Sequence, residues 1–284
     1  MELSIIILTY RKPDFLSSQL SSLRNQLRPG DEIVVTEDGR DEATARAIVQ
    51  QQEHLPIRHV RHDDDGRRLC LARNRGILAS RNPLLLFLDH DVILQPGSIE
   101  RMRHTIKTGW ALGLRRVMLD QGTTNKIVQD GIHLRPFFWS AIRWRSALQR
   151  WQGARFMFPL RRRDCSGSSN TWKGCASFGF MCFRDDVVAV NGFDTRYDGV
   201  AYAEDWDLFA RLEHVGISFG HPDRHCTVAH LEHGHATHRT DSRNYRLLEA
   251  TIASRQTWAE HGLSKMEESP PADEGSVDSP DPPS

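Results

Sequence analysis

The amino-acid sequence predicts an α/β fold in which helices flank a mainly parallel central sheet. Strand and helix patterns alternate through the first hundred residues, as in parallel sheets with right-handed crossovers. The strand segments are continuous apolar runs, typical of strands that are buried on both faces. Three of them end in the polar stretches "TYRK", "TEDGRD" and "DHDV". A parallel sheet brings such endings to one edge, where ligands bind in folds of this class.

Each element of the first half follows from a local pattern. The runs "LSIIILTY", "DEIVVTEDG", "PIRHVRH" and "PLLLFLDHDV" are predicted strands, at residues 3–10, 31–39, 56–62 and 83–92. The first helix is predicted at residues 13–26, because Phe15, Leu16, Leu20 and Leu23 fall on one helical face. Further helices are predicted at residues 41–53 and 69–81.

The second half is less regular. "GSSNTWKGCASFGFMCF" is predicted to be a loop and then a strand, and "GFDTRYDGVAYAEDWDLFARL" a glycine-rich loop that leads into a helix. A final helix is predicted from Ser242 to His261. We expect one domain at residues 1–265. Residues 266–284 contain proline, serine and acids but no basic residue, so we expect a disordered tail there.

Composition argues against several classes of protein. Lysine plus arginine and aspartate plus glutamate each number 37, and the net charge of zero argues against a dedicated nucleic-acid binder. The five cysteines are odd in number and not closely paired, which indicates a reducing compartment. They contain no CxxC pair, which argues against a cysteine zinc site. The N-terminal apolar run is too short for a signal peptide or a membrane span. We therefore expect a cytoplasmic protein.

Asp89 and Asp91 follow the most hydrophobic run of the chain. In an extended segment residues two apart face the same side, so the two carboxylates would point together and His90 away. Adjacent carboxylates repel each other unless a cation lies between them, and oxygen ligands suit Mg²⁺ or Mn²⁺. The alternative is a turn in which one aspartate caps the next segment. The position of the pair at the end of a buried strand favours the metal site.

Glu204, Asp205 and Asp207 gather at the start of a predicted helix. The simple explanation is that acids there complement the helix dipole and cap free N–H groups. Three acids after a loop rich in glycine and tyrosine exceed what capping requires. One of them is therefore a candidate general base for a hydroxyl group.

Five histidines occur between residues 225 and 238, namely His225, His230, His233, His235 and His238. Imidazole ligands would complement the two aspartates, and His230, His233 and His235 are the plausible ones. Not all five need be ligands, because solvated loops also carry histidine. "HLEHGH" does not match HExxH, so a zinc protease is not indicated.

In this order the motifs resemble family 2 glycosyltransferases of the GT-A fold. The matching segments are "SIIILTYRKPDFLSSQLSSL", "DEIVVTEDGRDEAT", "LARNRGILASRNPLLLFLDHDV" and "GFDTRYDGVAYAEDWDLFARL". The last is also similar to the C-terminal region of galactosyltransferases and chondroitin-polymerase-type enzymes. The resemblance implies that the single domain has a nucleotide-binding half at residues 1–100 and an acceptor-binding half at residues 101–265.

The resemblance implies that four residues bind the nucleotide. Thr9 and Tyr10 end the first strand and would contact it. Asp38 would hydrogen-bond the base, and Arg73 would reach the base or the diphosphate. The sequence departs from the family pattern at Arg11, where asparagine is common, and in "TEDGRD" and "DHDV", which stand for "VDDGST" and "DSDD". The first two departures bear on base preference, although UDP is favoured.

The resemblance also implies the chemistry. Asp89 and Asp91 would hold Mn²⁺ or Mg²⁺ on the diphosphate of the nucleotide sugar, with His230 as an additional ligand. Asp205 would be the catalytic base, and Glu204 would contact the acceptor or the donor sugar. One base and one displacement predict inversion at the anomeric carbon.

The implied reaction transfers a sugar to a hydroxyl group of a glycan or a lipid-linked saccharide, as in bacterial surface polysaccharide synthesis. The same residues allow two rival functions. One is a metal-dependent hydrolase built on the histidine and aspartate cluster, which would need no nucleotide sugar. The other is a non-catalytic module that binds a nucleotide sugar without transfer.

Residues 135–163 hold eight arginines, no acid and three of the seven tryptophans. They fit a solvated basic face whose aromatic residues pack on the sheet. They also fit an interfacial helix that docks on anionic lipid, which would place the protein peripherally at the inner face of the membrane. A third interpretation is a cradle for an anionic acceptor.

Overall fold

The structure is a computed structural model of the 284-residue chain. It describes residues 1–135, 137–149, 151–153, 172, 175–199, 202–222, 226–234 and 243–267. The predicted final helix therefore lacks a described Ser242, and His225, His235 and His238 lie outside the described residues, as does the chain after Glu267.

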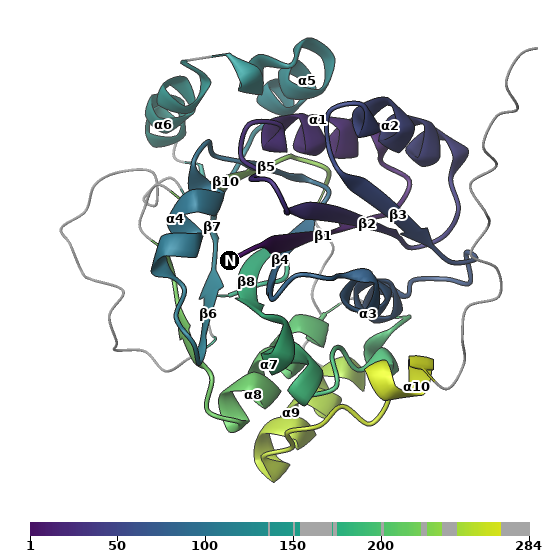
Figure 1. The fold of residues 1–284 in the computed structure, drawn as a ribbon. Coiled ribbons are helices and arrows are strands. Elements are labelled where there is room, and N and C mark those ends of the chain that lie inside the picture. The colour runs from purple at the N-terminus through teal and green to yellow at the C-terminus, as the bar shows by residue number, and fades with distance from the viewer. Residues whose placement is uncertain are drawn as a thin grey trace, which may run out of the picture.

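A central sheet organises the described part of the chain, and its strand order is β3-β2-β1-β4-β8-β6-β9 (Figure 1). The first four strands are parallel neighbours, β8 is antiparallel to both β4 and β6, and β9 is parallel to β6. The prediction of a mainly parallel sheet flanked by helices is confirmed. The strands are β1 (Leu3–Thr9), β2 (Glu32–Glu37), β3 (Ile57–Arg61), β4 (Leu84–Asp89), β6 (Trp110–Gly113), β8 (Gly179–Phe183) and β9 (Ser218–Gly220).

A smaller sheet crosses the end of β4, and the sequence patterns did not reveal it. Its order is β5 (Val92–Leu94), β10 (Thr227–His230) and β7 (Arg115–Met118). Strand β10 runs antiparallel to β5, with His230 opposite Val92. This pairing brings a histidine-rich segment next to Asp91 although the two are far apart in the sequence.

Helices cover both faces of the central sheet (Figure 1). Helices α1 (Pro13–Leu23) and α2 (Glu42–Gln52) pack on the face that buries Ile5 and Ile7 of β1. Helix α3 (Leu69–Ala79) packs on the face that buries Ile6, together with α7 (Arg184–Ala189) and α8 (Glu204–His214). The alternation of β1 between two cores explains why Ile5–Leu8 is apolar without a break.

The remaining described helices each bury at least one apolar side chain in one of three cores. They are α4 (Ser98–Thr105), α5 (Gln121–Asp130), α6 (Phe138–Leu148), α9 (Arg243–Ser254) and α10 (Leu263–Glu267), with short 3₁₀ turns η1 (Ile132–Leu134) and η3 (Thr195–Tyr197). The predicted final helix was too long, because α9 ends at Ser254 and Arg255 takes a positive φ of 52°. No described helix is long and apolar enough to cross a membrane.

One glycine sets the distance between α3 and the sheet. A Cβ at Gly76 would lie 2.6 Å from Ile6 and 2.8 Å from Thr36, so any larger residue would push the helix away. This close packing fixes the position of α3, which carries Arg73.

Candidate active site

The carboxyl ends of β1, β2 and β4 meet at one edge of the sheet, as predicted. The N–H of Asp38 donates to the carbonyl oxygen of Thr9 at 2.9 Å, and that of His90 donates to the carbonyl oxygen of Leu8 at 3.1 Å. Thr9, Asp38 and Asp89 therefore follow adjacent parallel strands. The Thr9 hydroxyl is buried and has no hydrogen-bond partner among the described residues.

Arg73 links this edge to helix α8. Its guanidinium donates to Oδ1 of Asp89 at 3.1 Å, to Oγ of Ser177 at 2.9 Å and to Oε1 of Glu204 at 3.5 Å. Burial disfavours the charge of Arg73, but Asp89 and then Glu204 outweigh it and raise the pKa of the guanidinium. A buried cation held by two carboxylates fixes their relative position.

Asp91, His230 and His233 form a cluster that could hold a metal ion. One ligand atom of each lies within 4.8 Å of the others. Nε2 of His233 is 2.7 Å from Oδ2 of Asp91, and Nε2 of His230 is 3.5 Å from the same oxygen. Of the three plausible histidine ligands, His230 was the first choice, and His233 lies closer to Asp91, while His235 is outside the described residues.

The electrostatics of the cluster keep its carboxylate ionised. Burial acts to raise the pKa of Asp91, but the hydrogen bond with His233 and the nearby histidine charges lower it to about 2. The hydrogen bond to Asp91 raises the pKa of His233, whereas burial lowers the pKa of His230.

The donor set fits a divalent transition-metal ion. Oδ1 of Asp91 is buried without a hydrogen-bond partner among the described residues. One carboxylate and two imidazoles suit Mn²⁺ better than Mg²⁺, which prefers oxygen ligands.

The expectation that Asp89 and Asp91 share one face of an extended strand was wrong in its geometry. Residues 90 and 91 form a turn between β4 and β5, so the two-residue alternation stops at Asp89. Asp89 pairs with Arg73, and Asp91 pairs with the histidines. Asp89 does not belong to the described cluster of Asp91, His230 and His233 that could hold a metal ion.

Asp205 lies in the first turn of α8 and is held by two backbone donors. Its Oδ2 accepts from the N–H of Ser177 at 3.0 Å, and its Oδ1 accepts from the N–H of Trp206 at 2.9 Å. Desolvation by the surrounding protein raises the pKa of Asp205 to about 6, and the charge of Glu204 adds to the shift. A carboxylate with this pKa is suited to remove a proton near neutral pH.

The loop before Asp205 is strained. Tyr202 and Ala203 have φ angles of 106° and 74°, which side-chain-bearing residues rarely adopt. Such strain is typical of functional sites, where the surroundings impose an uncommon conformation.

Asp207 has a structural role. It forms a buried ion pair with Arg211 at 2.8 Å and accepts hydrogen bonds from Tyr197 and Thr251. The three acids of the cluster therefore differ. Glu204 and Asp205 face Arg73 and Ser177, and Asp207 joins α8 to the core.

The predicted nucleotide contacts lie beside a loop whose role the sequence patterns did not predict. Both oxygens of Asp38 are 3.1 Å from the N–H of Arg68, and Oδ1 is 3.3 Å from Nε2 of His62. Tyr10 donates to Asp64 at 3.4 Å, and Arg11 pairs with the same carboxylate at 2.6 Å. The signal was available, because "HDDDGRR" places a run of acids directly after β3.

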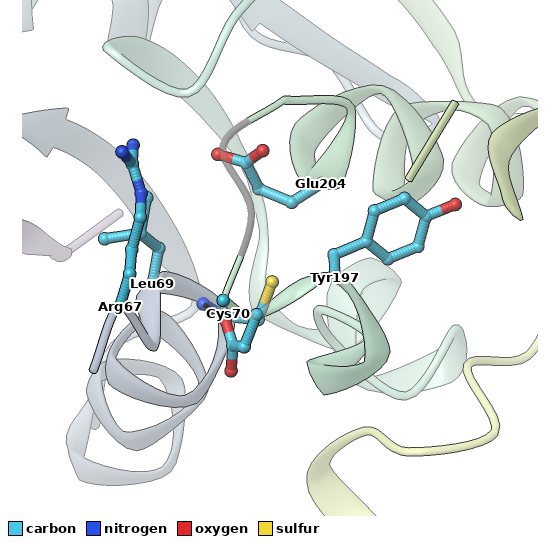
Figure 2. Close-up of a pocket in the computed structure, with 7 residues that line it drawn as sticks. Arg67, Leu69, Cys70, Tyr197 and Glu204 are labelled. Atoms are coloured by element: carbon cyan, nitrogen blue, oxygen red, sulfur yellow. Dashed lines mark hydrogen bonds between the residues drawn. The ribbon is translucent and has the colours of Figure 1, made fainter. Parts of the chain in front are cut away.

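A small hollow opens beside Glu204 at the start of α3 (Figure 2). Glu204 faces Arg67 across it, and Cys70 and Tyr197 are among the other residues that line it. The carboxylate of Asp198 accepts from the N–H groups of Cys70 and Leu71 at 2.8 and 3.2 Å, so it caps the N-terminus of α3. The hollow thus lies between Glu204, which accepts from Arg73, and Tyr197 of η3.

The sequence of the chain matches a known family. The model of the family described as "Glycosyl transferase family 2" matches residues 4–185, more than half of the chain. A curated relative, the hyaluronan synthase of Pasteurella multocida, is 37% identical over 95 residues, which are 33% of this chain and 10% of that protein. In four curated relatives, including this one, the matched region spans a quarter of the length or less.

Solved structures share the fold. Staphylococcus aureus TarS 1–349 in complex with UDP-GlcNAc superposes with a TM-score of 0.64 at 12% identity, over 93% of this chain and 69% of that one. The mannosyltransferase PcManGT of Pyrobaculum calidifontis, in complex with GDP-Man and Mn²⁺, gives a TM-score of 0.52 at 13% identity, over 89% and 62%. At these identities the likeness concerns the GT-A fold alone.

Proposed function

The chain belongs to glycosyl transferase family 2, and we propose that it transfers a sugar from a nucleotide sugar to a hydroxyl group of a glycan or lipid-linked saccharide. UDP is the proposed nucleotide, and inversion at the anomeric carbon is the proposed outcome. The observation that carries the proposal is the link through Arg73. This residue joins the nucleotide edge at Asp89 to the acid pair on α8.

Asp205 is the proposed base. It would take the proton of the acceptor hydroxyl as that oxygen attacks the anomeric carbon. Its two backbone hydrogen bonds, from Ser177 and Trp206, hold the carboxylate in one orientation. Glu204 keeps the local negative charge high and would contact the acceptor or the donor sugar.

Asp91, His230 and His233 are the proposed metal residues, and Mn²⁺ suits them better than Mg²⁺. A cation bound there would neutralise charge on the departing diphosphate. Asp89 is proposed to act beside it by holding Arg73, whose positive charge faces the same edge. Thr9, Tyr10 and Asp38 are proposed to line the nucleotide site at the ends of β1 and β2.

Names of relatives and neighbours support the substrate class. A hyaluronan synthase and a chondroitin synthase are among the curated relatives, which favours polysaccharide synthesis. A neighbour in complex with UDP-GlcNAc favours UDP. The family membership also disfavours the rival hydrolase, which would need no nucleotide sugar.

The test is a screen of UDP-, GDP-, CDP- and dTDP-sugars with and without Mn²⁺, read by thermal shift and by release of free sugar. We expect one nucleotide class to stabilise the protein in a Mn²⁺-dependent manner, with the effect lost in Asp91→Ala. Nucleotide binding without turnover in the presence of saccharide acceptors would indicate the non-catalytic module. Absence of any nucleotide effect would overturn the proposal.

A further inference from the structure

Helix α6 carries two apolar faces, of which only one is used by the fold. Phe138 and Ile142 are 6% and 3% exposed and pack into the core beside β5, β7 and β10. Phe137, Trp144 and Leu148 are 80%, 66% and 83% exposed. Phe137 directly precedes α6, and with Ala141 these residues recur at spacings of four, three and four, so they form one stripe that continues along the helix. We call Phe137, Ala141, Trp144 and Leu148 the outer stripe.

The outer stripe is concentrated, whereas other exposed apolar residues are scattered. Leu134, in η1, is 58% exposed and lies just before the stripe in the chain. Elsewhere in the described chain, exposed large apolar side chains such as Val49, Ile252 and Trp258 sit on separate elements. Single exposed apolar residues need no explanation, but a contiguous apolar patch marks an interaction surface.

The charge around the stripe points to the chemistry of its partner. In the described part of residues 131–149, around the stripe, Arg135, Arg143 and Arg145 are basic and no acidic residue occurs. Arg135 and Arg145 are exposed, and Arg145 also pairs at 3.2 Å with Asp120, the residue before α5. Aromatic and leucine side chains beside arginines are the composition of helices that lie in the interface of an anionic bilayer.

We propose that η1 and α6 dock on an anionic lipid surface through the outer stripe and its arginines. A second copy of the chain fits less well, because a two-fold contact would bring the same arginines face to face. A soluble acidic glycan would satisfy the arginines but would leave phenylalanine and leucine in water. An anionic bilayer would take up the apolar side chains and would also offer negatively charged head groups to the arginines.

Helix α6 packs in the same core as residues that adjoin the proposed metal ligands. Phe138 and Ile142 share a core with Ile93, Ala229 and Leu231, which flank the cluster of Asp91 and His230. The hydroxyl of Thr124 on α5 accepts from the N–H of Glu232 at 2.9 Å, next to His233. Figure 1 shows α5 and α6 together at the end of the molecule that carries β5 and β10. A bilayer on α6 would thus lie on the side of the site that holds the proposed cation.

The consequence for the substrate rests on the proposed function. If the chain transfers a sugar, the surface assigns a lipid-linked saccharide as its acceptor, presented from the bilayer. The docking itself needs no catalysis, so the two proposals can fail separately.

The experiment is co-sedimentation of the full chain with vesicles. One set is phosphatidylcholine alone, and the other is equal parts phosphatidylcholine and phosphatidylglycerol. We expect binding to the mixed vesicles, weakened about tenfold or more by Phe137→Ser, Trp144→Ser and Leu148→Ser combined. The matched control, Val49→Ser, Ile252→Ser and Trp258→Ser, should bind as the wild type does. Thermal melting checks that both triple variants are folded.

A second measurement identifies the contact directly. Lipids with brominated acyl chains should quench the tryptophan fluorescence of the wild type. Trp144→Phe keeps the stripe apolar, so it should still bind but show clearly less quenching. Raising the ionic strength from about 0.1 M to about 1 M shortens the screening length from about 10 Å to about 3 Å, and it should weaken binding.

Some results would overturn the inference. They are no binding of the wild type to mixed vesicles, equal binding by the stripe variant, or a wild-type dimer in sedimentation velocity that the stripe variant abolishes. Sugar release from the nucleotide sugar in solution should be equal in the stripe variant and the wild type. If neither releases nor transfers sugar while vesicle binding follows the stripe, the proposed function fails and the docking surface stands.

Discussion

The regions around Asp91 and Asp205 hold two carboxylates of the proposed site, and the pKa values of these carboxylates move in opposite directions. Around Asp91, burial is overcome by the hydrogen bond with His233 and the charges of other histidines, and the pKa falls to about 2. Around Asp205, burial acts together with the charge of Glu204, and the pKa rises to about 6. Cationic neighbours therefore keep Asp91 ionised, as the proposed metal ligand must be. An anionic neighbour helps to bring the pKa of Asp205 close to neutral pH, where the carboxylate can exchange a proton.

The two regions also differ in how they are built. The partners of Asp91 come from β10 and the segment after it, more than a hundred residues away in the chain. The immediate partners of Asp205 are its neighbours Glu204 and Trp206 and the N–H of Ser177. The environment of Asp91 therefore depends on the small sheet, and that of Asp205 depends mainly on the N-terminus of α8.

Replacing the proposed base should cause the largest effect. Asp205→Asn should lower kcat by about 10²- to 10⁴-fold, because the acceptor hydroxyl loses its base. The folded-state pKa of about 6 exceeds the ordinary 3.8, so ionisation of Asp205 costs stability as pH rises through this window. Relative to wild type, the unfolding free energy of Asp205→Asn should therefore rise between about pH 4 and about pH 8.

Asp207→Asn is the matched control, two residues along the same helix turn. It removes the partner of the buried Arg211 and should cost about 3 kcal/mol of stability. Denaturant titration and single-turnover assays separate the two effects. Full activity in folded Asp205→Asn would contradict the assignment of the base.

Replacing a histidine near Asp91 should have the next largest effect. His230→Ala and His233→Ala should each weaken Mn²⁺ binding about tenfold or more, because each removes an imidazole from the cluster. His104→Ala is the control, because His104 is 76% exposed and pairs only with Glu100 on α4 in the described structure. Titration calorimetry with Mn²⁺ alone measures the change.

The result can also discriminate between arrangements of the metal site. Undiminished affinity in His233→Ala, together with a loss in His230→Ala, would contradict the three-residue cluster. It would favour the pair of Asp89 and Asp91 expected from the sequence, with His230 beside them.

Local patterns predicted the fold of the first half well. The strands ending at Thr9, Glu37 and Asp89 were recognisable because burial on two faces leaves a continuous apolar run. The geometry of Asp89 and Asp91 was not predictable in this way, since a turn at residues 90 and 91 interrupts the alternation.

Long-range partners were the harder part of the site. The pairing of β10 with β5 brings His233 to Asp91, and no local pattern encodes that pairing. The role of Asp207 was likewise hidden, because its partners Tyr197 and Thr251 come from other elements. Acids at a helix start look alike in sequence, and only their surroundings tell them apart.

The smallest expected effect comes from Glu204, whose charge raises the pKa of Asp205. In Glu204→Gln that repulsion is lost, and Arg73 keeps its positive charge with one fewer carboxylate beside it. Both changes favour the ionised form of Asp205, so the acid limb of kcat/KM should move from about pH 6 to lower pH. The carboxylate of Asp91 should remain ionised throughout, because its pKa of about 2 lies below the range of the assay. Glu213→Gln, at the other end of α8, should leave the limb in place. An acid limb that stays at the same pH in Glu204→Gln would mean that a group other than Asp205 titrates there. The raised pKa of Asp205 would then not explain the pH dependence of catalysis.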